Sequence, residues 1–244
     1  MRIKKHTYLT PFSVSVAILA STCGQPTRAE NGVWTESLHF SGTIKHSPPL
    51  WDVQQGDSPK LLVSDLNMDV TRGGYHSKLE NIVLLEARIA KPIGATIGAD
   101  VNISIANVDI SSHDAKVAIV ARGNNNELGK VELELSEGWA IGYKLDDQEK
   151  AFKNSNASMS IAGVYAETLL DEHPKRKDAG LDEKWSRSEQ KVSRDDNIVR
   201  GSDTTLSTWL GTRVVVANTL EVSFPSSAIP SEWVAMLPVT ITPR

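Results

Sequence analysis

Runs in which apolar and polar residues alternate follow one another along most of this chain, with turn signals between them. A period of two places alternate side chains on opposite faces of an extended strand. Short runs separated by frequent turns are typical of an all-β sandwich, the fold class predicted here. The predicted strands lie at residues 62–70, 79–89, 101–105, 116–121, 131–135, 139–145, 206–216, 220–224 and 233–241.

Three local features refine this prediction. The apolar parity changes at Ala106 and Asn107, as a β-bulge would cause. Glu137 and Gly138 predict a hairpin turn between the runs on either side of them. A further apolar run at residues 159–170 is counted with the strands.

Alternation is also clear near residue 40, and it is repeated at the end of the sequence. Terminal residues usually fray, so strand patterns in both places indicate that each segment pairs with another strand, within the domain or on another chain. The mostly apolar positions that share one face are Trp34, Leu38, Phe40, Gly42 and Ile44 in the first run and Leu237, Val239 and Ile241 in the last.

Residues 1–29 are predicted to be a secretory signal peptide, because basic residues precede an apolar stretch at 12–20 and then small and polar residues. Cleavage after Ala29 would start an exported mature chain at Glu30. The single cysteine, Cys23, leaves a lipoprotein signal as the less favoured alternative, since the flanking residues do not match a bacterial lipobox. A mature chain of about 215 residues is long enough to bury a sizeable core without disulfides.

Charge and hydropathy argue against two classes of partner. The formal net charge is −4 and the pI is about 5.9, so no basic footprint for nucleic acid is present. No segment after the leader reaches the ~20 apolar residues that a membrane helix needs.

Charged residues are dense at 171–200, which predicts a solvated excursion between two strands. The spacing of Leu181 and Trp185 also leaves a short helix open. A sharper interpretation makes this segment a ligand-facing insertion, in which Lys184, Trp185 and Arg187 are candidate receptor contacts.

No catalytic motif is present in the sequence. It lacks a Gly-x-Ser-x-Gly elbow, a His-Glu-x-x-His pair and a phosphate-binding loop, and its cysteine lies in the leader. The histidines at 39, 46, 76, 113 and 173 lack metal-ligand spacing and are expected to be exposed. We therefore expect neither an enzyme nor a metal or cofactor site.

Several short motifs near the two ends occur in an order found in one known family. Residues 38–44, followed by Trp51 and Gly56, and later residues 217–224 and 237–242, resemble subunits of kappa-class, Fae-type chaperone-usher fimbriae. The resemblance covers the first and last fifths of the mature chain.

The resemblance implies an incomplete immunoglobulin-like β-sandwich that is completed by donor-strand complementation. Residues 45–244 would form this domain, with an insertion around 171–200. Residues 30–44 would be an N-terminal extension that adds a strand to a neighbouring copy, in place of a strand lent earlier by a periplasmic chaperone.

The donor strand within that extension would present Trp34, Leu38, Phe40, Gly42 and Ile44 on one parity. Three of these side chains would fill pockets, and Gly42 would lie where the groove is too shallow for a side chain. Their burial would contribute about 5 to 9 kcal/mol. A whole domain has a stability of ~5 to 15 kcal/mol, so a subunit without its donor is expected to be poorly stable.

The last strand, with Leu237, Val239 and Ile241, would lie beside the groove and be recognised by the chaperone. The family's aromatic residue near the C-terminus is replaced by Pro243 and Arg244, which suggests a minor subunit.

The resulting hypothesis is a non-enzymatic structural subunit of an extracellular fimbria that contributes to cell adhesion and virulence. Its expected partners are the periplasmic chaperone, the outer-membrane usher, neighbouring fimbrial subunits and a host glycan or protein receptor. The alternative is a secreted or periplasmic carbohydrate-binding module, a self-complete β-sandwich that would fold as a stable monomer without a strand donor.

Overall fold

The structure is a computed structural model that describes residues 14–19, 51–56, 67–69, 73–94, 100–110, 115–123, 127–145, 151–181, 186–187, 206–225 and 233–243. The predicted donor segment at 30–44 lies outside these residues, as do Lys184 and Trp185. The strands are β1 Val14–Leu19, β2 Trp51–Gln55, β3 Asn67–Asp69, β4 Gly74–Ile89, β5 Val101–Ile105, β6 Val108–Asp109, β7 Ala115–Gly123, β8 Leu128–Leu145, β9 Phe152–Ser155, β10 Ser186–Arg187, β11 Leu206–Pro225 and β12 Trp233–Pro243, and the helix is α1 Ile161–Asp171.

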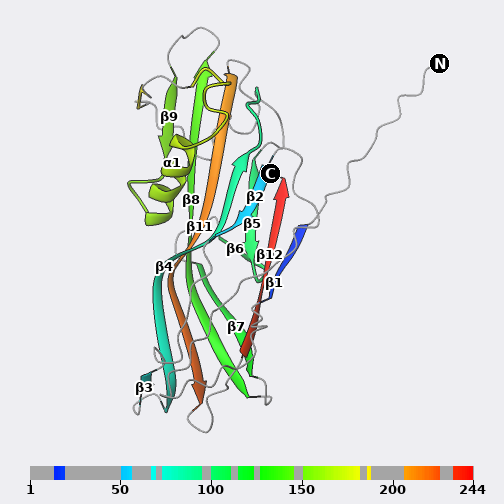
Figure 1. Ribbon diagram of the computed structural model, residues 1–244, viewed down its shortest axis with the longest axis vertical. Helices are drawn as coiled ribbons and strands as arrows, with labels where there is room; N and C mark the ends of the chain where they lie inside the picture. The colour runs from blue at the N-terminus through cyan, green and yellow to red at the C-terminus, as the bar shows by residue number, and fades with distance from the viewer. Residues whose placement is uncertain are drawn as a thin grey trace, which may run out of the picture.

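The described residues form a mostly antiparallel β structure with one α-helix. The strands follow the order β2-β4-β11-β8-β7-β12-β5-β6, and among the described pairs only β9 with β10 is parallel. The long strands β4, β8 and β11 run along the longest axis of the molecule (Figure 1). Helix α1 lies beside the upper parts of β8 and β11, whereas β12 lies on the opposite side with β1 and β5.

The residue pattern of strand β8 explains where helix α1 packs against the sheet. Its odd-numbered residues face the core from Val131 to Tyr143. Its even-numbered residues are Lys or Glu from 130 to 134 and then Ser, Gly or Ala from 136 to 142. Helix α1 covers this second set, and a Cβ atom on Gly138 would lie 1.8 Å from the carbonyl oxygen of Ala162. Small outer-face residues therefore permit the close approach of the helix.

The apolar run at 159–170 is helical rather than extended, so its prediction as a strand was wrong. Ser160 caps the helix by accepting a hydrogen bond from the backbone N–H of Gly163. Ala162, Ala166 and Leu170 recur at helical spacing and are buried against the sheet. A period near four, not two, was the signal in this run.

A predicted turn and a predicted bulge were also wrong. Strand β8 passes through Glu137 and Gly138 without a turn, because Gly138 serves helix packing. Ala106 and Asn107 form a two-residue turn between β5 and β6, not a bulge, and their φ angles are 49° and 65°. The two runs predicted at 206–216 and 220–224 are one continuous strand, β11, with register shifts along it.

Other predictions were confirmed. The segment 79–89 is extended within β4, residues 116–121 lie in β7, and residues 233–241 lie in β12. The structure also pairs β7 antiparallel with β8 and places Gly73, with φ of 69°, in the turn between β3 and β4.

The core is one continuous cluster between the strands. Its largest fully buried side chains include Trp51, Trp209, Tyr143, Phe224 and Ile89.

Candidate functional site

The best candidate for a binding site is one edge of β12, which we call the acceptor edge and define as residues 236–241 on the side away from β5. On one face of this segment Leu237, Val239 and Ile241 are buried in the core. On the other face Met236 is 51% exposed. The three residues predicted for the C-terminal strand thus lie together on its inner face.

The backbone direction of β12 follows from one hydrogen bond. The N–H of Ala106 donates to the carbonyl oxygen of Pro238 at 2.8 Å, so Pro238 directs its backbone carbonyl toward β5. Successive residues of an antiparallel strand direct their backbone N–H and C=O groups to opposite edges of the strand in alternation. Leu237, Val239 and Ile241 therefore direct their N–H and C=O groups to the acceptor edge, which offers three donors and three acceptors.

Two prolines of β12 lie at or near this edge, one within it and one beyond its end. Pro238 lacks an N–H on the β5 side, where the loss does not affect the acceptor edge. Pro243 shares the parity of Ile241, so it has no N–H to offer on the acceptor edge, and the row of donors stops at Ile241.

Strand β1 lies on the acceptor edge. It pairs antiparallel with β12 from Val14 opposite Ile241 to Leu19 opposite Met236. The segment predicted as the apolar part of the leader thus occupies this edge, far from it in sequence but adjacent in space (Figure 1). Nothing in the sequence pattern had indicated this pairing.

The opposite edge of β12 is tied to the rest of the sheet. Trp233 to Ala235 pair with β7, and Val239 to Pro243 pair with β5. The ring of Trp233 also packs edge-on against Phe224, with centroids 5.9 Å apart. The acceptor edge therefore belongs to a strand that is held firmly from its other side.

The candidate receptor segment lies at the other side of the molecule. Ser186 and Arg187 form β10, which pairs parallel with Phe152 and Lys153 of β9. Nearby, the Lys153 ammonium contacts the carboxylates of Glu167 at 2.7 Å and Asp171 at 2.9 Å, which joins β9 to α1. Of the candidate receptor contacts, the structure describes only Arg187, and it lies at the edge of β9.

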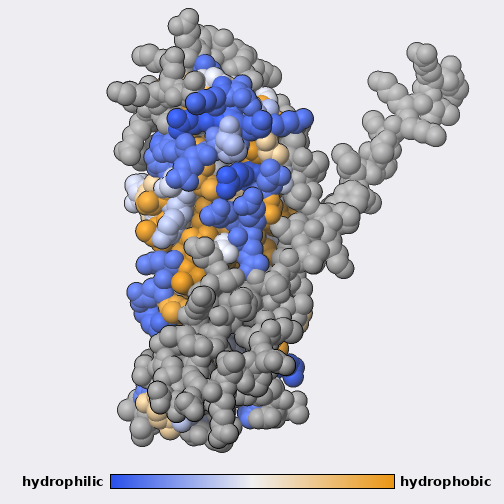
Figure 2. Space-filling view, in the orientation of Figure 1, coloured by the Kyte–Doolittle hydropathy of each residue, from blue (hydrophilic) through white to orange (hydrophobic). Residues whose placement is uncertain are grey.

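Helix α1 exposes several apolar side chains at its first turn and just before it. Figure 2 shows hydrophobic residues among hydrophilic ones on the left of the described surface, where α1 lies. The exposed residues are Met159, Ile161, Val164 and Tyr165.

His173, at the base of the insertion, is buried, so its prediction as an exposed residue was wrong. Its Nε2 donates to the carbonyl oxygen of Ile89 at 2.8 Å, and its Nδ1 accepts from the N–H of Lys175 at 3.1 Å. Burial lowers the pKa of His173, and the nearby Arg88 acts in the same direction. The neutral imidazole therefore fits both hydrogen bonds.

A buried ionic cluster joins β11, β8 and the start of β5. Arg213 donates to the Asp100 carboxylate, and its Nε lies 3.6 Å from Oε1 of Glu137. The guanidinium also lies over the ring of Trp51, 5.8 Å from its centroid. Sequence reasoning missed this cluster because its members are far apart in the chain and lie in apolar surroundings.

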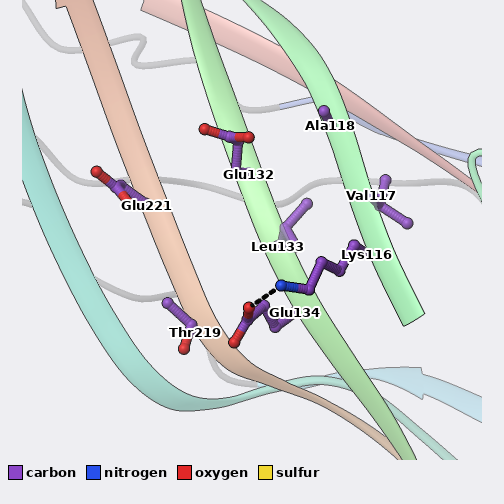
Figure 3. A pocket seen from close by; sticks show the side chains of 8 residues that line it. All are labelled: Lys116, Val117, Ala118, Glu132, Leu133, Glu134, Thr219 and Glu221. Carbon is purple, nitrogen blue, oxygen red and sulfur yellow. Dashed lines mark ion pairs between the residues drawn. The ribbon is translucent and has the colours of Figure 1, made fainter. Parts of the chain in front are cut away.

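The solvent-facing side of β7, β8 and β11 carries a shallow hollow of about 230 Å³ (Figure 3). Lys116 and Glu134 form an ion pair of 2.8 Å across it, and this contact lowers the pKa of Glu134. Similar pairs join Lys130 to Glu132 and Lys78 to Glu80. The residues around the hollow are Lys116, Val117, Ala118, Glu132, Leu133, Glu134, Thr219 and Glu221.

The described part of the chain contains no group of three or more metal-ligating side chains arranged to hold an ion. Its helix is too short to cross a membrane. No protein-family model matches the chain, and a search of curated proteins found no match.

Proposed function

We propose that this chain is a minor structural subunit of a bacterial surface fimbria that is assembled by donor-strand exchange. The observation that carries the proposal is the acceptor edge of β12. This edge receives a sequence-distant strand in antiparallel register over the segment 236–241. An immunoglobulin-like sandwich completed in this way accounts for a last strand that pairs with β5 and β7 on one side and receives a sequence-distant strand on the other.

The chemistry of the edge suits the predicted donor. Leu237, Val239 and Ile241 offer backbone hydrogen bonds at every second residue, and their side chains continue the core. A strand with apolar residues at every second position, as in the predicted donor segment at 34–44, would form the same ladder. It would also extend the apolar face.

The expected partners follow from the same edge. An open strand edge beside an apolar core aggregates readily, so a periplasmic chaperone would cover it until an outer-membrane usher passes the subunit to its neighbour. The insertion beside β9 and α1 supplies the proposed receptor contact for a host glycan or protein, with Lys184, Trp185 and Arg187 as its residues.

The test uses a chain that starts at residue 45 and a synthetic peptide of residues 30–44. We expect the peptide to raise the thermal unfolding midpoint of the truncated chain strongly. The matched control peptide carries Phe40→Asp, which places a charge at an inward position, and it should have no effect. A truncated chain that is already stable and ignores the peptide would instead support the self-complete carbohydrate-binding module.

A further inference from the structure

Strand β1 belongs to the predicted leader, yet it lies on the edge to which we assign the donor of a neighbouring subunit. We propose that the leader is the first occupant of the acceptor edge, and that its removal opens this edge to other strands. The inference rests on the proposed function and deepens it by naming how access to the acceptor edge is regulated.

The register gives this occupant a specific geometry. Val14, Val16 and Ile18 lie opposite Ile241, Val239 and Leu237, the residues whose backbone groups point to the acceptor edge. In an antiparallel ladder, residues opposite one another in this way exchange both hydrogen bonds. Val14, Val16 and Ile18 therefore direct their backbone groups toward β12, and Ser15, Ala17 and Leu19 direct theirs away.

The residue types at these positions suit a strand. The three positions that bond to β12 all carry β-branched residues, which favour extended backbone. The predicted donor has Leu38, Phe40, Gly42 and Ile44 at the same spacing of two. Two segments of one chain thus have the pattern needed for one edge, and both cannot occupy it together.

A tethered segment has a large advantage in such a competition. A strand in the same chain competes at an effective concentration on the order of millimolar, whereas a donor on another copy competes at its actual concentration. A chain that keeps its leader is therefore closed to donors. Copies of the chain become able to assemble only after the leader has been cut.

The first experiment uses the full chain with its leader intact and a protease site inserted after Ala29. Hydrogen exchange is measured at the amides of Leu237, Val239 and Ile241 before cutting, and again after cutting and removal of the leader by gel filtration, at a protein concentration too low for donors on other copies to bind. We expect protected amides in the intact chain and exchange at least tenfold faster after the cut. Equal exchange before and after the cut would overturn the inference.

Two proline variants of the intact chain test the register. Val16→Pro removes an N–H that points toward the Val239 carbonyl and places a proline ring in the ladder, so β1 should detach and the protection of the Val239 amide should be lost. Ala17→Pro, one residue along, removes an N–H that points away from β12, and it should leave most of that protection. Equal losses in both variants would contradict the proposed register, and no loss in either variant would mean that β1 does not protect this edge. The cut wild-type chain gives the answer independently if a variant fails to fold.

A final addition separates the two proposals. The peptide of residues 30–44 is added to the cut chain after the leader has been removed. Restored protection at Val239 supports donor binding at the same edge. An edge that opens on cutting but ignores the peptide would contradict the proposed function while the inference about the leader stands.

Discussion

The lower halves of β8 and β11, residues 128–135 and 217–225, and their upper halves both bury their inner faces in the core, but their outer faces differ. In the lower half the outer face meets solvent, and its Glu134 and Glu132 form surface ion pairs with Lys116 of the neighbouring β7 and with Lys130. In the upper half α1 covers the outer face, and Thr212 donates from β11 to the carbonyl oxygen of Ala166 at 2.7 Å. In their lower halves the same strands therefore face the core on one side and water on the other, whereas in their upper halves both sides are buried.

The ion pairs beside the two halves also differ in their exposure to solvent. Lys116 and Glu134 are largely exposed, so water screens their attraction. Arg213, Asp100 and Glu137 are buried, and each depends on its partners for the solvation that it has lost. Ion pairs of similar appearance should therefore have very different effects on stability.

The largest effect is expected from Arg213→Met in the upper half. The substitution keeps an apolar stem but leaves the carboxylates of Asp100 and Glu137 buried without their cation. We expect a loss of about 3 to 5 kcal/mol in the free energy of unfolding, measured by urea denaturation. Lys116→Met, the matched change in the lower half, should leave the midpoint almost unchanged, and equal losses would refute the distinction.

A smaller effect is expected from Gly138→Ala at the contact of β8 with α1. The added methyl group overlaps the carbonyl of Ala162, so the helix must move away from the sheet. We expect a loss of about 1 to 3 kcal/mol in the free energy of unfolding. The control is Ala118→Ser on the solvent-facing side of β7, where a change within about 0.5 kcal/mol is expected.

The difference between the halves also decides how much the sequence could predict. In the lower half the outer residues are Lys and Glu, so alternation was readable and the strands of residues 116–121 and 131–135 were predicted correctly. In the upper half the outer residues of β8 are Ser, Gly and Ala, which resemble turn residues when read alone. Gly138 was therefore taken for a turn, although a helix distant in sequence explains it.

The candidate site was predictable only in part. The inward parity of Leu237, Val239 and Ile241 follows from alternation along β12, and the structure places all three in the core. The pairing of β1 with this strand could not be predicted, because alternation of apolar and polar residues indicates a strand but not the strand with which it pairs. The Arg213 cluster and His173 also escaped prediction, since their burial depends on contacts between distant segments.

The next effect concerns pH and His173, whose pKa is lowered by burial and by Arg88, against the opposing influence of its hydrogen bond to the Ile89 carbonyl and of Asp52. The unfolded chain binds a proton at His173 near its ordinary pKa of 6.5, whereas the folded chain does so only at lower pH. Stability should therefore be full above about pH 6.5 and should fall as the pH decreases toward the folded pKa.

Urea denaturation of His173→Gln between pH 7.5 and about 5 checks this assignment, because the variant should lose part of the pH dependence. His76→Gln, in the lower half, removes a histidine that contacts Glu221 at the surface and serves as the control. An unchanged pH slope in the His173 variant would contradict the assignment.

The smallest effect is expected at the Lys116 and Glu134 pair. The contact lowers the pKa of Glu134, but both side chains are exposed, and an exposed pair loses its attraction as salt screens it. A double-mutant cycle with Lys116→Met and Glu134→Gln should show weak coupling at low salt and none at about 1 M salt, where the Debye length is near 3 Å. Coupling that persists at high salt would contradict this prediction. It would mean that the pair resembles the buried cluster of the upper half, because only charges shielded from solvent escape such screening.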